Sequence, residues 1–129
     1  MKNTEDNIVA DKSYHFACRT IRACKYLREN TKEFVLTNQF LRSGTAIGAL
    51  VRESRFAQSR KDFINKMHIA LKEANETEYW IKLLHESGHF DDKSYKSIWR
   101  DCDELIRLLA SIVKTTKETP ESAKPILNS

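Results

Sequence analysis

Residues 59–84 read SRKDFINKMHIALKEANETEYWIKLL, and the spacing of their apolar side chains decides the fold. Seven residues, all but one of them apolar, recur in alternating steps of four and three: Phe63, Met67, Ala70, Ala74, Thr77, Ile81 and Leu84. This repeat places one narrow stripe along a single face of an α-helix. A helix with such a stripe packs lengthwise against its neighbours at a shallow angle.

The same repeat returns in the last third of the chain, in Tyr95, Ile98, Cys102, Leu105, Leu109, Ile112 and Thr116. Asp91 or Asp92 is a suitable N-cap for this helix. Ser59, with Asp62 three residues later, resembles a capping box for the helix before it. Two long helices with matching stripes and a short connection are expected to pack antiparallel.

Helical spacing also predicts two earlier helices, over residues 11–30 and 37–56, the second with Thr37 as its N-cap. Small residues on one side of the second helix, Gly44, Gly48 and Ala49, favour close approach by a partner helix. We therefore expect an all-α, up-down-up-down antiparallel four-helix bundle over residues 11–118. Residues 1–10 are expected to be flexible, and residues 119–129 to form a disordered tail.

The composition is that of one soluble domain of 129 residues, with only three Gly and two Pro. No apolar run approaches the roughly 20 residues that span a bilayer, and the N-terminus does not resemble a signal peptide. These features predict a cytoplasmic protein with no membrane partner. Cys18, Cys24 and Cys102 have no metal-type spacing, so buried free thiols and no cofactor are expected.

Residues 85–89, HESGH, match the H-E-x-x-H pattern of zinc proteases. That chemistry needs both histidines on one face of a continuous helix. Gly88 stands where a left-handed helix cap belongs, which would leave His85 in the helix and His89 in the turn. The sequence therefore predicts no metal site and no catalytic residues, and an enzyme at this motif is the weakest reading.

Positive charge is concentrated in the first half of the chain. Residues 12–66 carry 12 Lys and Arg and four acids, whereas residues 67–129 carry nine and eleven. Arginine-rich surfaces hold nucleic-acid backbones without reading bases, although a solvated basic face is the alternative. The candidate nucleic-acid-binding residues are Arg19, Arg22, Arg52, Arg55, Arg60 and Lys61. Ser59 and the first amides of the third helix add donors suited to a phosphate.

Besides Leu83 and Val113, three apolar residues lie beside the stripes rather than on them: Trp80, Trp99 and Ile106. One bundle core does not obviously bury them all, and large apolar patches rarely stay exposed. They are therefore the candidate interface of a homo-oligomer.

The stretch RSGTAIGALVRESRFAQSRKDFINKMHIALKEANETEYWIKLL, residues 42–84, resembles a known family. It is the four-helix-bundle family encoded in intervening sequences of bacterial 23S rRNA genes, and it is also similar to the accessory protein of diversity-generating retroelements. The matching positions are Ile47, Glu53, Ser59, Phe63, Ile69, Ala70, Leu71 and Glu76. Where many members have Asn-Ile-Ala-Glu-Gly, this chain has Leu50 and Ser54 in place of the Asn and the Gly.

The resemblance implies a homopentamer and, from the retroelement relatives, a basic surface that binds nucleic acid and a reverse transcriptase. Together with the charge pattern, it predicts a non-enzymatic oligomeric bundle that binds RNA or DNA. The alternative is a scaffold that binds only protein, its basic face serving solubility.

Overall fold

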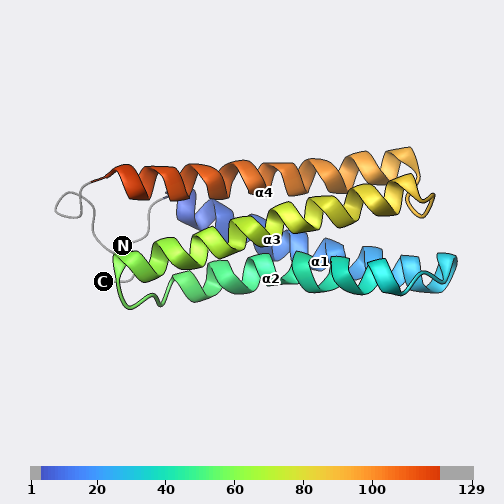
Figure 1. The fold of residues 1–129 in the computed structure, drawn as a ribbon, viewed down its shortest axis with the longest axis horizontal. Coiled ribbons are helices and arrows are strands. Elements are labelled where there is room, and N and C mark those ends of the chain that lie inside the picture. The colour runs from blue at the N-terminus through green and yellow to red at the C-terminus, as the bar shows by residue number, and fades with distance from the viewer. Residues whose placement is uncertain (1–3, 120–129) are drawn as a thin grey trace.

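The computed structural model describes residues 4–119, where it shows four α-helices and no strand. They are α1 (Thr4–Tyr26), α2 (Val35–Ser54), α3 (Arg60–Glu86) and α4 (Asp92–Glu118). A short π-helical segment, η1 (Leu27–Thr31), follows α1 directly. The helices lie side by side along one long axis, and successive helices are joined at alternate ends (Figure 1). Helix α1 contacts α2 and α4, and α3 contacts the same two helices.

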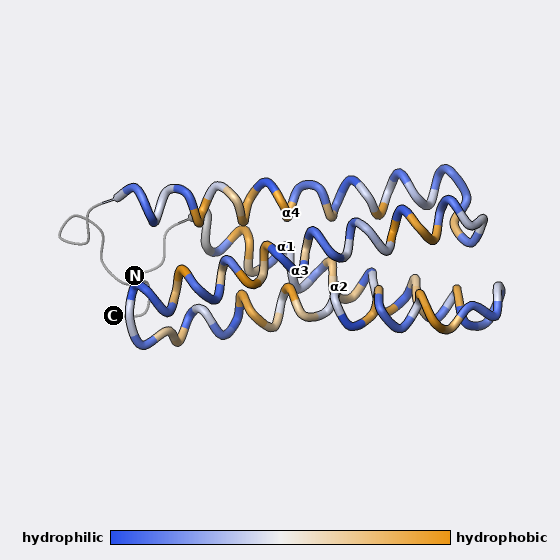
Figure 2. The backbone as a smooth tube through the Cα atoms, in the orientation of Figure 1, coloured by the Kyte–Doolittle hydropathy of each residue, from blue (hydrophilic) through white to orange (hydrophobic). Residues whose placement is uncertain are grey.

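The stripe on residues 63–84 forms the core as predicted, since all seven of its side chains are buried. The stripe on α4 is buried as well, except for Tyr95, which is half-buried and stacks on His85 with ring centroids 4.0 Å apart. Helices α1 and α2 contribute large buried side chains such as Phe16 and Phe40. Figure 2 shows apolar residues recurring along each helix, as expected when each presents one side to a shared core.

Helices α1 and α2 approach each other closely at two glycines. A Cβ atom added to Gly44 would lie 2.8 Å from Cγ2 of the buried Thr20, and one added to Gly48 would lie 3.2 Å from the Ser13 carbonyl oxygen. The small side predicted for α2 is therefore where α1 packs.

The start of α2 differs from the prediction. Thr37 was expected to be the N-cap, but the helix begins at Val35 and Thr37 is buried within it. The Glu33 carboxylate accepts hydrogen bonds from the N–H of Leu36 (3.0 Å), the N–H of Thr37 (2.8 Å) and the Thr37 hydroxyl (2.9 Å). Because one carboxylate accepts hydrogen bonds from two amides at the helix start that would otherwise be unpaired, the helix begins two residues before Thr37.

The start of α1 also differs, because the helix begins at Thr4 rather than at Asp11. Val9 is fully buried in the core, which explains why the helix extends through part of the segment expected to be flexible. Residues 1–3, and the expected tail beyond Thr119, lie outside the described residues.

All three thiols are free. Cys24 and Cys102 are buried, and Cys18 is half-buried rather than buried. Burial raises the pKa of the Cys24 thiol to about 11 and raises the pKa of Cys102 further still. Both buried thiols donate to backbone carbonyls, of Thr37 and Ala74, and serve as packing.

Candidate nucleic-acid interface

The HESGH segment does not present two histidines on one helical face. Helix α3 ends at Glu86, and Gly88 has a φ of +85°. His85 Nε2 lies 2.7 Å from Asp92 Oδ1, whereas His89 Nδ1 lies 2.9 Å from Ser87 Oγ. The predicted helix end is thus confirmed. Within residues 4–119 no three His, Cys, Asp or Glu side chains come together as metal ligands would.

The six candidate basic residues form two groups toward opposite ends of the bundle. Arg52, Arg55, Arg60 and Lys61 flank the α2–α3 connection, at one end in Figure 1. Arg19 and Arg22 lie in the second half of α1 and face the first turns of α4, near the other end. The two groups are separated along the bundle, because Arg19 and Arg22 lie toward the α1–α2 connection whereas the other four lie at the α2–α3 connection.

We define the basic end as Arg52, Arg55, Lys61 and Lys117. Arg52 and Lys61 are exposed, and neither makes an ion pair or hydrogen bond with any residue the structure describes. Arg55 is half-buried and donates to Asn7 Oδ1 at 3.3 Å. Lys117, from the last turn of α4, lines a shallow cleft of about 480 Å³ together with Lys61 and His68.

Lys117 and His68 were missed by the sequence reasoning. Lys117 lies 56 positions from Lys61, so only the packing of α4 on α3 brings the two together. His68 follows Lys61 by seven residues, and this helical spacing could have identified it.

Arg60 has a structural contact that the sequence did not predict. Its Nη2 donates to the Thr116 carbonyl in the last turn of α4. Its Nη1 and the Thr116 hydroxyl are buried, with no partner among the described residues. Arg60 therefore connects the start of α3 to the end of α4, and it is less available to a phosphate than Arg52 or Lys61.

The donors at the start of α3 are also partly used. The Ser59 hydroxyl accepts from the N–H of Asp62 (3.0 Å), and Asp62 Oδ2 accepts from the N–H of Gln58 (3.1 Å). This resembles the capping box that the sequence suggested, except that Asp62 accepts from the residue before the N-cap. Asp62 also adds a negative charge there, so the helix amides at the basic end are poorly suited to a phosphate.

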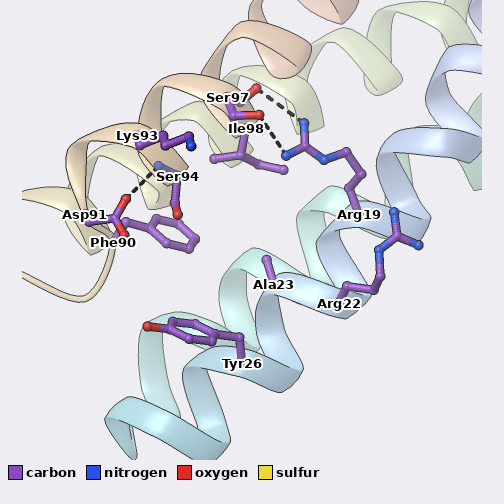
Figure 3. A pocket seen from close by; sticks show the side chains of 10 residues that line it. All are labelled: Arg19, Arg22, Ala23, Tyr26, Phe90, Asp91, Lys93, Ser94, Ser97 and Ile98. Atoms are coloured by element: carbon purple, nitrogen blue, oxygen red, sulfur yellow. Dashed lines mark hydrogen bonds between the residues drawn. The ribbon is translucent and has the colours of Figure 1, made fainter.

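The Arg19 side chain is likewise paired within the protein. Its Nη1 lies 2.5 Å from Asp101 Oδ2, and its Nη2 donates to Ser97 Oγ at 3.0 Å, so it links α1 to α4. Arg22, one turn further along α1, is exposed and borders a cleft between α1 and α4 (Figure 3).

The candidate interface residues are only partly accessible. Trp80, Trp99 and Ile106 are half-buried and pack against the core. The indole of Trp80 donates to Glu76 and that of Trp99 to Glu78, both at 2.9 Å. The more exposed large apolar residues lie on or beside α1 and α2, with one exception on α3: Ile8, Tyr14, Ile21, Tyr26, Phe34, Val35, Phe56 and Tyr79.

The profile of the 23S rRNA-intervening sequence protein family matches residues 5–111. The chain belongs to this family. A crystal structure of a protein of unknown function from the S23 ribosomal protein family of Bacteroides thetaiotaomicron is similar, with 53% identity and a TM-score of 0.85. The match covers 86% of this chain and 99% of that chain.

The family predicted from residues 42–84 is therefore confirmed, while the relation to the retroelement accessory protein stays a prediction. No curated protein matches the chain. The 23S rRNA-intervening sequence family is one of unknown function and is not known to be enzymatic, so the function has to be argued from this chain's own surface. None of the described helices is long and apolar enough to cross a membrane.

Proposed function

We propose that this up-down-up-down bundle is a non-enzymatic cytoplasmic protein that assembles into a homo-oligomer, with five copies favoured, and binds RNA or DNA backbones through its basic end. The observation that carries the proposal is the state of Arg52 and Lys61. Both are exposed at the same end of the bundle, and neither is paired within the part of the chain that the structure describes. Because these cations have no ion pair or hydrogen bond with a described residue to break, they are available to contact a phosphate.

The charge at the basic end of one chain is modest, because Asp62 lines the cleft with Lys61 and Lys117, and Asp11 lines another with Arg52 and Arg55. An oligomer would repeat these cations in each copy and raise affinity without any new contact. Exposed Phe56, in the α2–α3 connection, offers a ring on which an unpaired base can stack. Single strands are therefore expected to bind at least as well as duplexes.

The test is fluorescence anisotropy with mixed-sequence RNA and DNA at about 50–200 mM salt, the range over which phosphate contacts weaken strongly. We expect binding that is nearly blind to sequence, with a log–log salt slope near −0.9 per phosphate contacted on duplex DNA. Replacing Arg52, Arg55 and Lys61 with Ala should flatten this slope and leave helicity and oligomer mass unchanged.

The matched control replaces Lys72, Lys82 and Lys96 with Ala. These three lysines are exposed on α3 and α4 and are also unpaired within the described residues, so the control removes the same charge from other surfaces. Equal weakening by both triple variants would show a general charge effect and reject the basic end as the site. Absence of binding at the low-salt end would reject the function itself.

The second candidate function is a protein-binding scaffold, favoured by the exposed apolar residues on α1 and α2. Tyr14 and Ile21 are 72% and 54% exposed, although a monomeric bundle gains nothing from exposing them. The partner class that the family resemblance implies is a reverse transcriptase. An intact oligomer that binds no nucleic acid under any of these conditions would favour this candidate.

A further inference from the structure

A cleft of about 590 Å³ lies between the second half of α1 and the start of α4 (Figure 3). Its volume is in the range of small-molecule sites, roughly 300–1,000 Å³. Phe90 and Ile98 form an apolar floor, since both line the cleft and are almost completely buried. The rim is polar and comes from both helices, with Arg22 and Tyr26 on α1 and Lys93 on α4.

Two cations on this rim, Arg22 and Lys93, are exposed, and neither side chain makes an ion pair or hydrogen bond with the described residues. The charge of Lys93 does act on the neighbouring Asp91 carboxyl. Arg19 also lines the cleft, but Asp101 balances its charge.

The acids near the cleft do not cancel these two cations. Asp91 lines the cleft and accepts from the N–H of Ser94 at 2.7 Å. The hydrogen bonds from Ser94, followed by a backbone hydrogen bond and the positive charge of Lys93, hold the pKa of the Asp91 carboxyl below its ordinary value, so it stays charged and offsets the Lys93 cation. The Asp92 carboxylate bonds His85 instead. One positive charge remains in excess, which suits an anionic ligand.

Tyr26 supplies an aromatic surface beside these cations. It follows Arg22 by one helical turn, its side chain lies on the side of the cleft facing Phe90 (Figure 3), and the residue is 52% exposed. The π-helical segment η1 begins at the next residue, and such segments occur frequently at functional sites. An aromatic ring of a ligand can pack between Tyr26 and the apolar floor while its anionic group reaches the cations.

We propose that this cleft binds a nucleotide, with the base against Tyr26 and the phosphate attracted by the two rim cations, Arg22 on α1 and Lys93 on α4. The ligand class is a nucleoside monophosphate, either free or as the phosphorylated end of a strand. An inorganic anion would leave the ring and the apolar floor unused, and an uncharged ring would leave the cations unused. The cleft lies far from the basic end, so the inference stands independently of the proposed function.

The experiment is isothermal titration of the full chain with AMP, adenosine, ribose 5-phosphate and inorganic phosphate. We expect AMP to bind, and each of the other three to bind at least about tenfold more weakly. Ribose 5-phosphate and inorganic phosphate lack the stacked base, which contributes roughly 1–3 kcal/mol, and adenosine lacks the charge that the cations attract. Tyr26→Ala should weaken AMP binding by about tenfold or more, and Tyr26→Phe should retain it. Arg22→Gln and Lys93→Gln should weaken the binding of AMP but not of adenosine.

Matched controls are Lys25→Gln and Lys96→Gln, which neutralise exposed lysines on the same two helices outside the cleft. They should leave AMP binding unchanged, as should the triple variant at the basic end. The proposal is overturned if AMP fails to bind at millimolar concentration. It is also overturned if AMP and inorganic phosphate bind equally and Tyr26→Ala has no effect.

Competition separates the two sources of the ligand. A 5′-phosphorylated oligonucleotide that displaces AMP, when its unphosphorylated form does not, assigns the cleft to strand ends. If neither oligonucleotide displaces AMP, the cleft takes free nucleotides, and both results uphold the site.

Discussion

His85 and His89 lie four residues apart, yet the helix end between them gives each a different environment. His85 stacks on Tyr95 with an interplanar angle of 7° and pairs with Asp92, so it contributes to the α3–α4 contact. His89 lies past the end of α3 and contacts Ser87. A five-letter motif that would define a metal site on a continuous helix here has two separate structural roles.

We predict that His85→Ala leaves the bundle folded and lowers its free energy of unfolding by about 1 kcal/mol, the scale of one partly exposed hydrogen bond and one stacked ring. Chemical denaturation measures this change, with His89→Ala as the control that should cost less. Elemental analysis of the purified wild-type protein should find no stoichiometric zinc. Stoichiometric zinc that is lost in His85→Ala would contradict the structural assignment.

The sequence shows which residues are charged, but it did not predict which of these side chains would be paired within the fold. Arg22 and Arg52 have no ion-pair or hydrogen-bond partner in the described part of the chain, as expected for solvated surface residues. Arg19 is taken by Asp101, 82 positions away, and Arg60 by the Thr116 carbonyl, 56 positions away. Such pairing depends on which helices become neighbours, and no local pattern encodes it.

At the scale of the element, Glu33 determines where α2 starts. Burial alone would raise the pKa of its carboxyl, but hydrogen bonds from the N–H groups of Leu36 and Thr37 and from the Thr37 hydroxyl outweigh it, and the pKa is lowered. The stripes on α3 and α4 were predictable because periodicity reports directly on burial. The start of α2 was not predictable, because Glu33 accepts its hydrogen bonds from outside the helix. Thr37 is of a residue type that commonly caps helices, so the sequence favoured it instead.

Glu33→Gln is predicted to lower the free energy of unfolding at pH 7 by about 0.5–2 kcal/mol, the usual cost of a lost cap. The folded-state pKa lies below the ordinary value of 4.5, so the stabilisation is present above that value and is lost as pH falls through the folded-state pKa. The gap between wild type and variant should therefore narrow from pH 7 to pH 3. Glu29→Gln, an exposed acid in η1, is the control and should change little at either pH. A gap that is constant with pH would argue against a charged cap.

At the scale of the whole molecule, charge and exposed apolar surface are distributed unevenly. Residues 12–66, which include most of α1 and all of α2, carry 12 cations and four acids, a net charge of +8. Residues 67–129, which include most of α3 and all of α4, carry nine cations and eleven acids, a net charge of −2. Tyr14 and Ile21 are exposed beside α2, in the positive half. A head-to-tail contact between the positive half of one copy and the negative half of the next would match opposite charges, and such contacts form a ring when the rotation between copies closes.

This arrangement predicts that the wild-type protein forms a cyclic oligomer, five copies of the 15.0 kDa chain having a mass of 75 kDa. Ile21→Glu should reduce the mass toward one chain and leave helicity intact, because Ile21 is 54% exposed and is not one of the buried core residues. Light scattering at micromolar concentration measures the mass, and circular dichroism measures the helicity.

Two further variants locate the contact surfaces. Val35→Glu, at an exposed position at the end of the bundle, is the control and should keep the wild-type mass. Trp99→Glu should weaken assembly and also destabilise the bundle, because Trp99 is half-buried and its indole donates to Glu78. A wild-type mass of one chain would reject the oligomer. If Ile21→Glu keeps the wild-type mass while Trp99→Glu dissociates it without unfolding, the contact includes the surface around Trp99 and not the surface around Ile21.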